Sequence, residues 1–198
     1  MTVEQAELTT ELASIQSCQS GQMESFVLLY DRYVEKIYRF LYFRTFQKEV
    51  AEDITSEVFF KAMDKIHQFN PEKGSFQVWL YQIARNLLID EFRKRKPIEN
   101  IDAHYDIADS TDLATELQSK LSHEALQKLL QQLPEESQEL ITMRLWDELS
   151  YSEIAVITGK TEGSLKMQFS RIIGRLQQHT DLLIFIIILQ PLIFPKKG

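Results

Sequence analysis

One stretch decides the fold of the C-terminal half: residues 149–176 read LSYSEIAVITGKTEGSLKMQFSRIIGRL. Ser150 and Glu153 are three residues apart and predict a capping box, so a short helix begins there. Gly159 is expected to end this helix, and Thr161 can cap a second one that continues through the stretch. Two short helices separated by a tight turn are typical of a helix-turn-helix.

The second of these helices has two different faces. At 100° per residue, four apolar side chains lie within about 60° of one another and are expected to face a core: Leu165, Phe169, Ile172 and Leu176. The opposite face is small, polar and basic, with Lys166 at its flank: Ser164, Met167, Ser170, Arg171 and Gly174. Such a face suits the DNA major groove, whereas the alternative is a solvated helix of an ordinary bundle.

The composition is that of a soluble globular protein. Of 198 residues, 44% are apolar and 26% charged, and the single cysteine, Cys18, excludes a disulfide framework. No Lys or Arg precedes Arg32, so a secretory signal is not expected. The longest apolar run, residues 182–189, is far shorter than the roughly 20 residues of a membrane-spanning helix.

The formal net charge of −7 is unevenly distributed. Residues 1–24 carry −4, and residues 97–124 carry seven acids and one lysine. Residues 25–96 carry thirteen bases and ten acids, and residues 125–198 balance at zero. The acidic total therefore does not exclude nucleic acid, because local patches decide binding.

Helical periodicity also dominates the N-terminal half. Apolar residues recur at spacings of three and four over residues 25–46 and again over residues 50–66. After the turn-forming residues 70–74, Ser75 is expected to cap a third helix that ends before Pro97. Its apolar face comprises Phe76, Trp79, Leu80, Ile83 and Leu87. Aromatic residues beside basic residues 93–96 also fit single-stranded nucleic acid, although helical spacing favours a core role for Phe76 and Trp79.

These patterns predict an all-α protein of two small helical domains joined by an acidic linker. We expect an acidic N-terminal segment, a first domain, the linker, a second domain and an apolar tail, with these bounds: 1–21, 22–96, 97–122, 123–178 and 179–198. A short helix is expected over residues 111–121, and Leu140, Ile141 and Leu145 are expected to share a buried face. The tail is expected to pack on the second domain or a partner. Membrane contact is the less favoured alternative, and the tail cannot span a bilayer alone, because Gln190 and Pro191 interrupt its apolar residues.

Three motifs in this order resemble the bacterial sigma-70 family, extracytoplasmic-function group. Residues 51–62, AEDITSEVFFKA, resemble its core-polymerase-binding segment, and residues 69–86, FNPEKGSFQVWLYQIARN, its −10 recognition segment. Residues 149–155 with residues 161–166 resemble its −35-reading helix-turn-helix. The resemblance implies regions 2 and 4 of a sigma factor and covers most of the chain, about residues 22–178.

The resemblance also implies roles for individual residues. Core polymerase would be bound by Asp53, Glu57, Phe60 and Lys61, with Phe59 packing behind or beside them. The −10 DNA would be contacted by Phe69, Trp79, Arg85, Asn86, Arg93, Lys94 and Arg95. Within this set, Asn86 would line the pocket of a flipped base and the three terminal cations would hold phosphates. The −35 DNA would be contacted by Thr161, Ser164, Lys166, Met167, Gln168, Arg171 and Arg175.

Three positions depart from the family pattern. Ser56 stands where the family usually has Gln, Gln168 where it often has Arg, and Met167 where it has a small residue. The −35 sequence that this chain reads is therefore expected to be unusual.

We interpret the chain as a sigma factor and not an enzyme. It is expected to be a cytoplasmic monomer when free, without cofactor or metal, whose partners are core RNA polymerase, promoter DNA and an anti-sigma factor. The alternative is a helix-turn-helix regulator that binds duplex DNA by itself and gives no role to Asp53 and Glu57. The four histidines are scattered and no glycine-rich phosphate loop is present, which argues against an enzyme.

Overall fold

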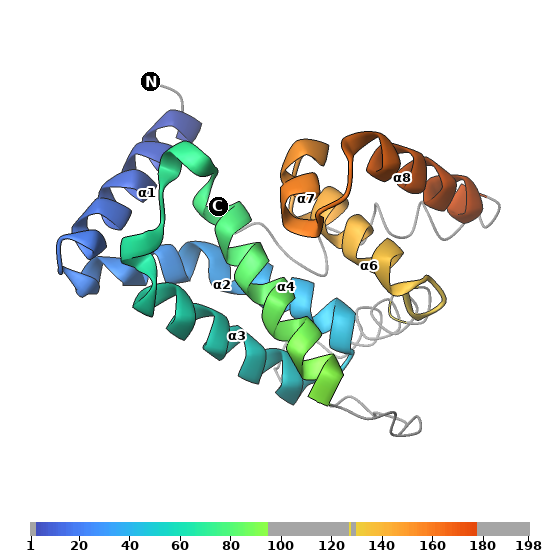
Figure 1. Cartoon of the computed structure of the whole chain (residues 1–198), viewed down its shortest axis with the longest axis horizontal. Coiled ribbons are helices and arrows are strands. Elements are labelled where there is room, and N and C mark those ends of the chain that lie inside the picture. The colour runs from blue at the N-terminus through green and yellow to red at the C-terminus, as the bar shows by residue number, and fades with distance from the viewer. Residues whose placement is uncertain (1–2, 95–126, 128–129, 178–198) are drawn as a thin grey trace, which may run out of the picture. The chain divides into compact units, whose positions relative to one another are not determined.

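The computed structural model describes residues 3–94, 127 and 130–177, which divide into two compact units (Figure 1). All regular elements in the described part of the chain are helical, which confirms the predicted all-α fold. The predicted linker, its short helix, Arg95 and the apolar tail lie outside the described residues.

The first unit contains four helices joined by short turns. The helices are α1 (Val3–Gln19), α2 (Phe26–Thr45), α3 (Lys48–Asp64) and α4 (Phe76–Lys94). One-turn 3-10 helices lie between them: η1 (Met23–Ser25), η2 (Ile66–Gln68) and η3 (Pro71–Lys73). The predicted helices over residues 25–46, over residues 50–66 and after Ser75 are confirmed.

The core of this unit forms where α2, α3 and α4 pack together. Fully buried side chains come from all three helices: Ile37, Phe40, Val58, Leu80 and Tyr81. Ring contacts connect α2 to α4, with centroid distances of 5.2 Å for Phe40–Tyr81 and 5.8 Å for Tyr33–Phe76. Burying such side chains is the main free-energy source of the fold, at roughly 1.5–3 kcal/mol each.

Helix α1 was not anticipated, because residues 1–21 were expected to be an acidic segment outside the first domain. Helix α1 instead belongs to the first unit and buries Ile15 and Cys18. Its packed face also contains the polar residues Glu11 and Ser14, so the sequence shows no clear apolar stripe. Burial raises the pKa of the Cys18 thiol, which keeps that side chain neutral in the core.

A polar cluster connects α1 to α2 inside the unit. The Tyr33 hydroxyl donates a hydrogen bond to Glu11 Oε2, and Arg32 Nε lies 3.3 Å from the same oxygen. The buried carboxylate therefore has both a neutral donor and a cation, as a buried charge requires. Burial, and then the hydrogen bond to Glu11, strongly raise the pKa of Tyr33.

The second unit contains the predicted helix-turn-helix and the segment before it. Its elements are α6 (Glu135–Ile141), the π-helix η4 (Thr142–Trp146), α7 (Tyr151–Thr158) and α8 (Glu162–Gln177). Fully buried residues come from each of these elements and from residue 130 before them: Leu130, Leu140, Ile141, Met143, Ile154 and Leu165.

The π-helix changes which side chains face this core. Leu145 was expected on the buried face with Leu140 and Ile141 but is only half-buried, whereas Met143 and Trp146 are buried. The prediction was wrong for Leu145, because it assumed the 3.6-residue period and a π-turn advances more residues per turn.

The Tyr33–Glu11 contact predicts a pH-dependent stability. Replacing Tyr33 with Phe is expected to lower the free energy of unfolding of the first unit by about 1–3 kcal/mol at pH 7, because Glu11 loses a buried donor. In the wild type the raised pKa of Tyr33 gives stability that is full below pH of about 10 and is lost as pH rises further. Urea unfolding followed by Trp79 fluorescence, in a Trp146→Phe background, should show this loss.

The matched control is Tyr30→Phe, because Tyr30 lies on the same helix but its side chain is exposed. This variant should have the same free energy of unfolding as the wild type at pH 7 and should lose stability at high pH in the same way. Identical pH curves for wild type and Tyr33→Phe would contradict the prediction.

Candidate nucleic-acid interface

Local hydrogen bonds stabilise the helix-turn-helix at the start of α7 and in the turn between α7 and α8. Ser150 Oγ accepts from Glu153 N at 3.2 Å, and Glu153 Oε2 accepts from Ser150 N at 2.8 Å, which confirms the predicted capping box. Gly159 ends α7 with a left-handed φ of 75°, and its N donates to the Ala155 carbonyl. Thr161 Oγ1 then accepts from Ser164 N at 3.3 Å and caps α8. The turn therefore fixes where α8 begins.

Helix α8 separates a buried face from an exposed one, as predicted. Leu165 and Ile172 are buried, and Phe169 is half-buried with its ring 6.0 Å from that of Tyr151. The side chain of Leu176 lies outside the described part. The opposite side exposes Ser164, Met167, Ser170, Arg171 and Gly174. Thr161, Lys166 and Arg175 are exposed as well, so six of the seven expected −35 residues are accessible and Gln168 is the exception.

Exposed neighbours hold the cations of α8 in the free protein. Lys166 Nζ lies 3.3 Å from Glu162 Oε2 and 5.8 Å from the ring centroid of Tyr151. Arg171 Nη2 donates to Met167 Sδ at 3.2 Å. These contacts are weak because solvent screens them, so phosphates or base edges can replace them at low cost.

Gln168 is oriented differently from the other expected −35 contacts. It is half-buried, and its Nε2 lies 3.5 Å from Ser137 Oγ on α6. Its position is about 100° around the helix from Met167. Its side chain therefore faces α6 rather than the exposed face. The resemblance to the family, which compares residue types at single positions, could not show this orientation.

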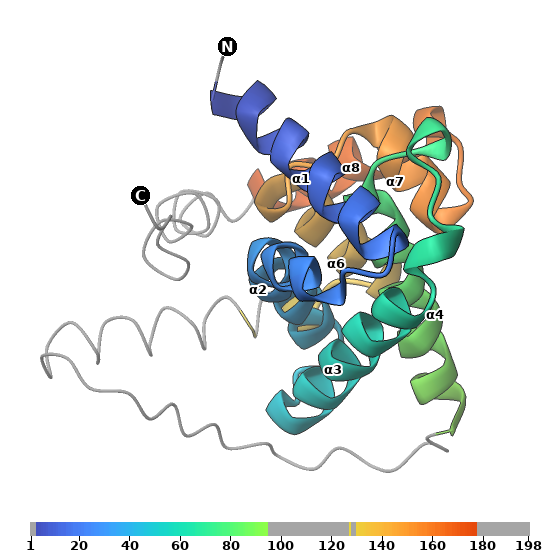
Figure 2. The same ribbon diagram turned by 90° about the vertical axis from the view of Figure 1, so that its left-hand side faces the viewer.

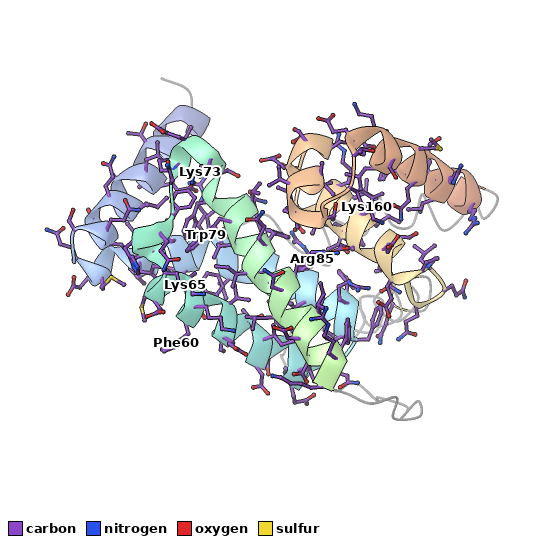
Figure 3. All side chains as sticks on the ribbon, viewed as in Figure 1. Phe60, Lys65, Lys73, Trp79, Arg85 and Lys160 are labelled. Carbon is purple, nitrogen blue, oxygen red and sulfur yellow. The ribbon has the colours of Figure 1, made fainter. Side chains whose placement is uncertain are left out.

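A second surface lies on α3, where the expected core-binding residues come together. Asp53 and Glu57 are exposed, and Phe60 is 67% exposed on the outer side of the helix (Figure 3). Lys61 Nζ pairs with Glu57 Oε1 at 2.8 Å. Positions 53, 57 and 60 fall on one helix face, so two carboxylates and an apolar ring share a surface that a partner can cover.

Phe59 and Phe60 have opposite roles. Phe59 is buried, and its ring lies 4.8 Å from that of Tyr30 and 6.5 Å from that of Phe26. Sequence reasoning missed that Tyr30 is itself 42% exposed and that Val27, Leu28 and Met63 are exposed too. The signal was the run of five apolar residues at 26–30, which one helix face cannot bury completely.

The third surface comprises α4 and the segment of residues 69–75 that precedes it. Phe69 is only 7% exposed, and its ring lies 5.4 Å from that of Phe76 and 5.5 Å from that of Trp79. Trp79 is half-buried and projects from α4 toward this segment (Figure 3). The ring of Phe69 therefore belongs to the core, and the structure does not offer it for stacking on a base.

Asn86 and the basic end of α4 are accessible. Asn86 is exposed, seven residues after Trp79 and hence on the same side two turns away. Arg85 is half-buried, whereas Arg93 and Lys94 are exposed, with Arg93 Nη1 3.6 Å from Asp90 Oδ1. This side of α4 presents an aromatic ring, an amide and two cations in sequence.

The 69–75 segment is locally ordered. Asn70 Oδ1 accepts from Glu72 N at 2.8 Å, and Ser75 Oγ accepts from Val78 N at 3.3 Å, which confirms Ser75 as the cap of α4. Between these residues Gly74 has φ of 153°, a conformation that side chains with a Cβ rarely adopt. The segment thus connects α3 to α4 in a defined path.

In the described part of the chain, no helix is long and apolar enough to cross a membrane. Among the same residues, no group of three or more His, Cys, Asp or Glu side chains could hold a metal ion.

Comparison with known proteins gives matches over both units. Residues 29–98 match the family described as Sigma-70 region 2, and residues 123–176 match Sigma-70, region 4. The chain is 35% identical over 158 residues to the ECF RNA polymerase sigma factor BldN of Streptomyces coelicolor, covering 77% of this chain and 59% of that relative. It is 31% identical over 169 residues to the ECF RNA polymerase sigma factor SigW of Bacillus subtilis, covering 79% of this chain and 89% of that relative.

A solved structure gives the same picture of the fold. The chain is similar to the sigma factor RpoE in its complex with the anti-sigma factor NepR from Bartonella quintana, with a TM-score of 0.62 and 24% identity. The match covers 78% of this chain and 96% of that one.

Two glycines of the helix-turn-helix predict stability changes of opposite sign. Gly159→Ala is expected to lower the free energy of unfolding by about 1 kcal/mol, because a φ of 75° is unfavourable for a Cβ. Gly174→Ala is expected to raise it by about 0.5–1 kcal/mol, because Gly174 lies within α8 and a Cβ there meets no atom within 4 Å. Urea unfolding followed by Trp146 fluorescence in a Trp79→Phe background measures both. A rise in the free energy of unfolding for Gly159→Ala would contradict the role of the left-handed turn, and a fall for Gly174→Ala would contradict the gain expected within α8.

Proposed function

Because the chain belongs to the extracytoplasmic-function group of the sigma-70 family, we propose that α3 binds core RNA polymerase and that α4 and α8 direct it to promoters. Helix α4 would read the −10 element and α8 the −35 element. The observation that carries this proposal is the presence of regions 2 and 4 in one chain, each with an accessible surface. A regulator that binds duplex DNA by itself would leave the exposed α3 surface without a role.

The α3 surface supports core binding through charge and apolar burial together. Asp53 and Glu57 provide negative charge that favours a basic partner surface, and the exposed ring of Phe60 would lose water on binding. Large aromatic side chains are frequent energetic centres of interfaces. Lys61 would contribute mainly by orienting Glu57, with which it pairs.

The α4 surface supports strand capture. Asn86 can donate and accept hydrogen bonds toward one base edge, and Trp79 on the same side can border a base that has left the stack. Flipping a base costs a few kcal/mol, which contacts to the base and to phosphates must offset. Arg85, Arg93 and Lys94 would supply the phosphate contacts. The buried ring of Phe69 would hold Trp79 in place through their ring contact.

The α8 surface supports duplex reading in the major groove. Arg171 would contact a base edge, whereas Lys166, Arg175 and the polar residues Thr161 and Ser164 would hold phosphates or position the helix. Met167 would supply an apolar contact. Gln168 would support the packing on α6 from which α8 projects.

No covalent chemistry is needed for this activity. Promoter opening would draw its free energy from binding an unpaired strand, so we propose a factor that acts without catalysis of its own. We expect it to act in the cytoplasm, where polymerase and promoter DNA are found, and to be regulated by an anti-sigma factor.

The core-binding role predicts the effect of charge reversal. The double variant Asp53→Lys and Glu57→Lys should weaken binding to core polymerase by about 10- to 100-fold, because attraction becomes repulsion at a covered surface. Titration of fluorescently labelled chain with purified core polymerase measures the affinity, and transcription from a genomic DNA library measures the activity.

The matched control reverses Asp31 and Glu35, two exposed carboxylates also four residues apart, on α2. It should retain core affinity within about threefold, since these charges lie on α2 rather than α3 and solvent screens exposed charges. Equal affinities for the wild type and the α3 double variant would rule out this assignment.

The −35 role predicts different losses for two cations of α8. Arg171→Ala should cost about 1–3 kcal/mol on the preferred sequence and relax the preference at one base pair, if Arg171 contacts a base bidentately. Lys166→Ala should weaken binding evenly across sequences and reduce the salt slope by about one unit. Binding of holoenzyme to a library of −35 variants at several salt concentrations separates the two.

The control for these variants is Arg144→Ala. Arg144 donates to the Leu149 carbonyl at 3.0 Å and lies over the Tyr151 ring, so its loss should lower stability and leave base preference unchanged. An even loss for Arg171→Ala on every sequence would show that Arg171 holds the backbone instead.

A further inference from the structure

Gln19, the last residue of α1, connects that helix to the chain that follows α3. Its Nε2 donates to two backbone carbonyl oxygens, that of Ile66 at 3.0 Å and that of Phe69 at 2.8 Å. These bonds use both N–H groups of one amide and bridge 47 and 50 positions of sequence. Figure 3 labels Lys65 and Lys73, which bracket this region, and Figures 1 and 2 show that it lies beside the end of α1.

The two carbonyls lie where the 69–75 segment begins. The ring of Phe69 fixes this point through Phe76 and Trp79, and Gln19 fixes its backbone from the side of α1. At the far end Ser75 caps α4. Residues 71–75 are exposed. The contacts of Phe69 and Gln19 at one end and the Ser75 cap at the other therefore determine where this exposed part of the segment lies.

Helix α1 is itself a firm support for Gln19. Ile15 and Cys18, within one turn of Gln19, are buried, and Glu11 is bound to Tyr33 and Arg32 of α2. The amide therefore starts from a packed element rather than from a free end of the chain. This rigidity is what a group that positions another segment requires.

We propose that Gln19 is a positioning residue for −10 recognition. By holding the Ile66 and Phe69 carbonyls it sets the path of the 69–75 segment, and through Phe69 it sets the orientation of Trp79 on the side of α4 that carries Asn86. This inference rests on the proposed role of α4, and it adds a residue from outside the matched range 29–98.

Two substitutions test the contact itself. Gln19→Ala removes both donors, and Gln19→Glu keeps the shape but places carboxylate oxygens against two carbonyl oxygens. The control is Gln16→Ala, because Gln16 is an exposed glutamine on the same helix. Asn86→Ala serves as the reference for a residue that contacts the base.

The measurement uses full-length chains assembled with core polymerase. Wild-type holoenzyme first selects a −10 sequence from random-sequence promoters, and the probe is a fluorescein-labelled single strand carrying that sequence. Gln19→Ala is expected to weaken probe binding by about tenfold, since two hydrogen bonds are lost. Gln19→Glu is expected to weaken it by more, since repulsion between oxygens replaces the two hydrogen bonds. Core affinity and the binding by Gln16→Ala should stay within about twofold, which is the scatter of a neutral surface change.

Hydrogen exchange of the free chain gives a second, polymerase-independent measurement. Gln19→Ala should speed exchange in peptides covering residues 66–75 and leave α2 and the C-terminal half of α4 unchanged. Uniform acceleration throughout the first unit would instead show a general loss of stability and overturn the proposal.

The outcomes separate this proposal from the function on which it rests. If Asn86→Ala weakens probe binding and both Gln19 variants bind like the wild type, Gln19 positions nothing and only the inference fails. If wild-type holoenzyme selects no −10 sequence, or if Asn86→Ala also has no effect, the assigned role of α4 fails and the inference fails with it.

Discussion

The ring of Phe76 holds together the parts of the first unit on which its surfaces depend. Phe76 is buried at the start of α4, and its ring contacts Tyr33 of α2, Phe69 of the preceding segment and Trp79 one turn later. Tyr33 in turn binds Glu11 of α1. One aromatic cluster therefore fixes α1, α2 and the start of α4 relative to one another. The exposed polar side chains that these helices carry thus keep defined positions.

The helix-turn-helix depends on a different constraint. Its helices are short, and isolated helices of this length are marginal in water, so their ends must be specified locally. The capping box at Ser150, the left-handed Gly159 and the Thr161 cap provide this specification, and Leu165 and Ile172 then bury one side of α8. A reading helix needs a defined start because its first turns carry several of the side chains that approach the groove.

Local patterns were sufficient for some features and not for others. Capping residues and three-to-four spacing predicted α2, α3, α4, α7 and α8, since short-range hydrogen bonds and one apolar face determine them. Helix α1 was missed because Glu11 and Ser14 are in its packed face, and Leu145 was misplaced because a π-turn changes the period. For the sites, resemblance suggested which residues matter but not their exposure: Phe60 is accessible, whereas Phe69 is buried and Gln168 faces α6. The Gln19 contacts depend on packing between distant segments, which no local pattern encodes.

The charge pattern explains how an acidic protein can still present cations to nucleic acid. Arg93 and Lys166 lie on the helices proposed to contact DNA, and each pairs with a carboxylate three or four residues away on the same helix in a substantially exposed pair. Such pairs contribute little to stability, typically about 0.3–0.5 kcal/mol on a helix, so a phosphate can replace the carboxylate with small loss. The carboxylates would remain beside a bound phosphate, however, and their repulsion would subtract from the affinity. Under the proposed function, each short-range pair would therefore weaken sequence-independent binding of the free protein to DNA, and the additional binding energy would come from contacts that depend on sequence or on the polymerase.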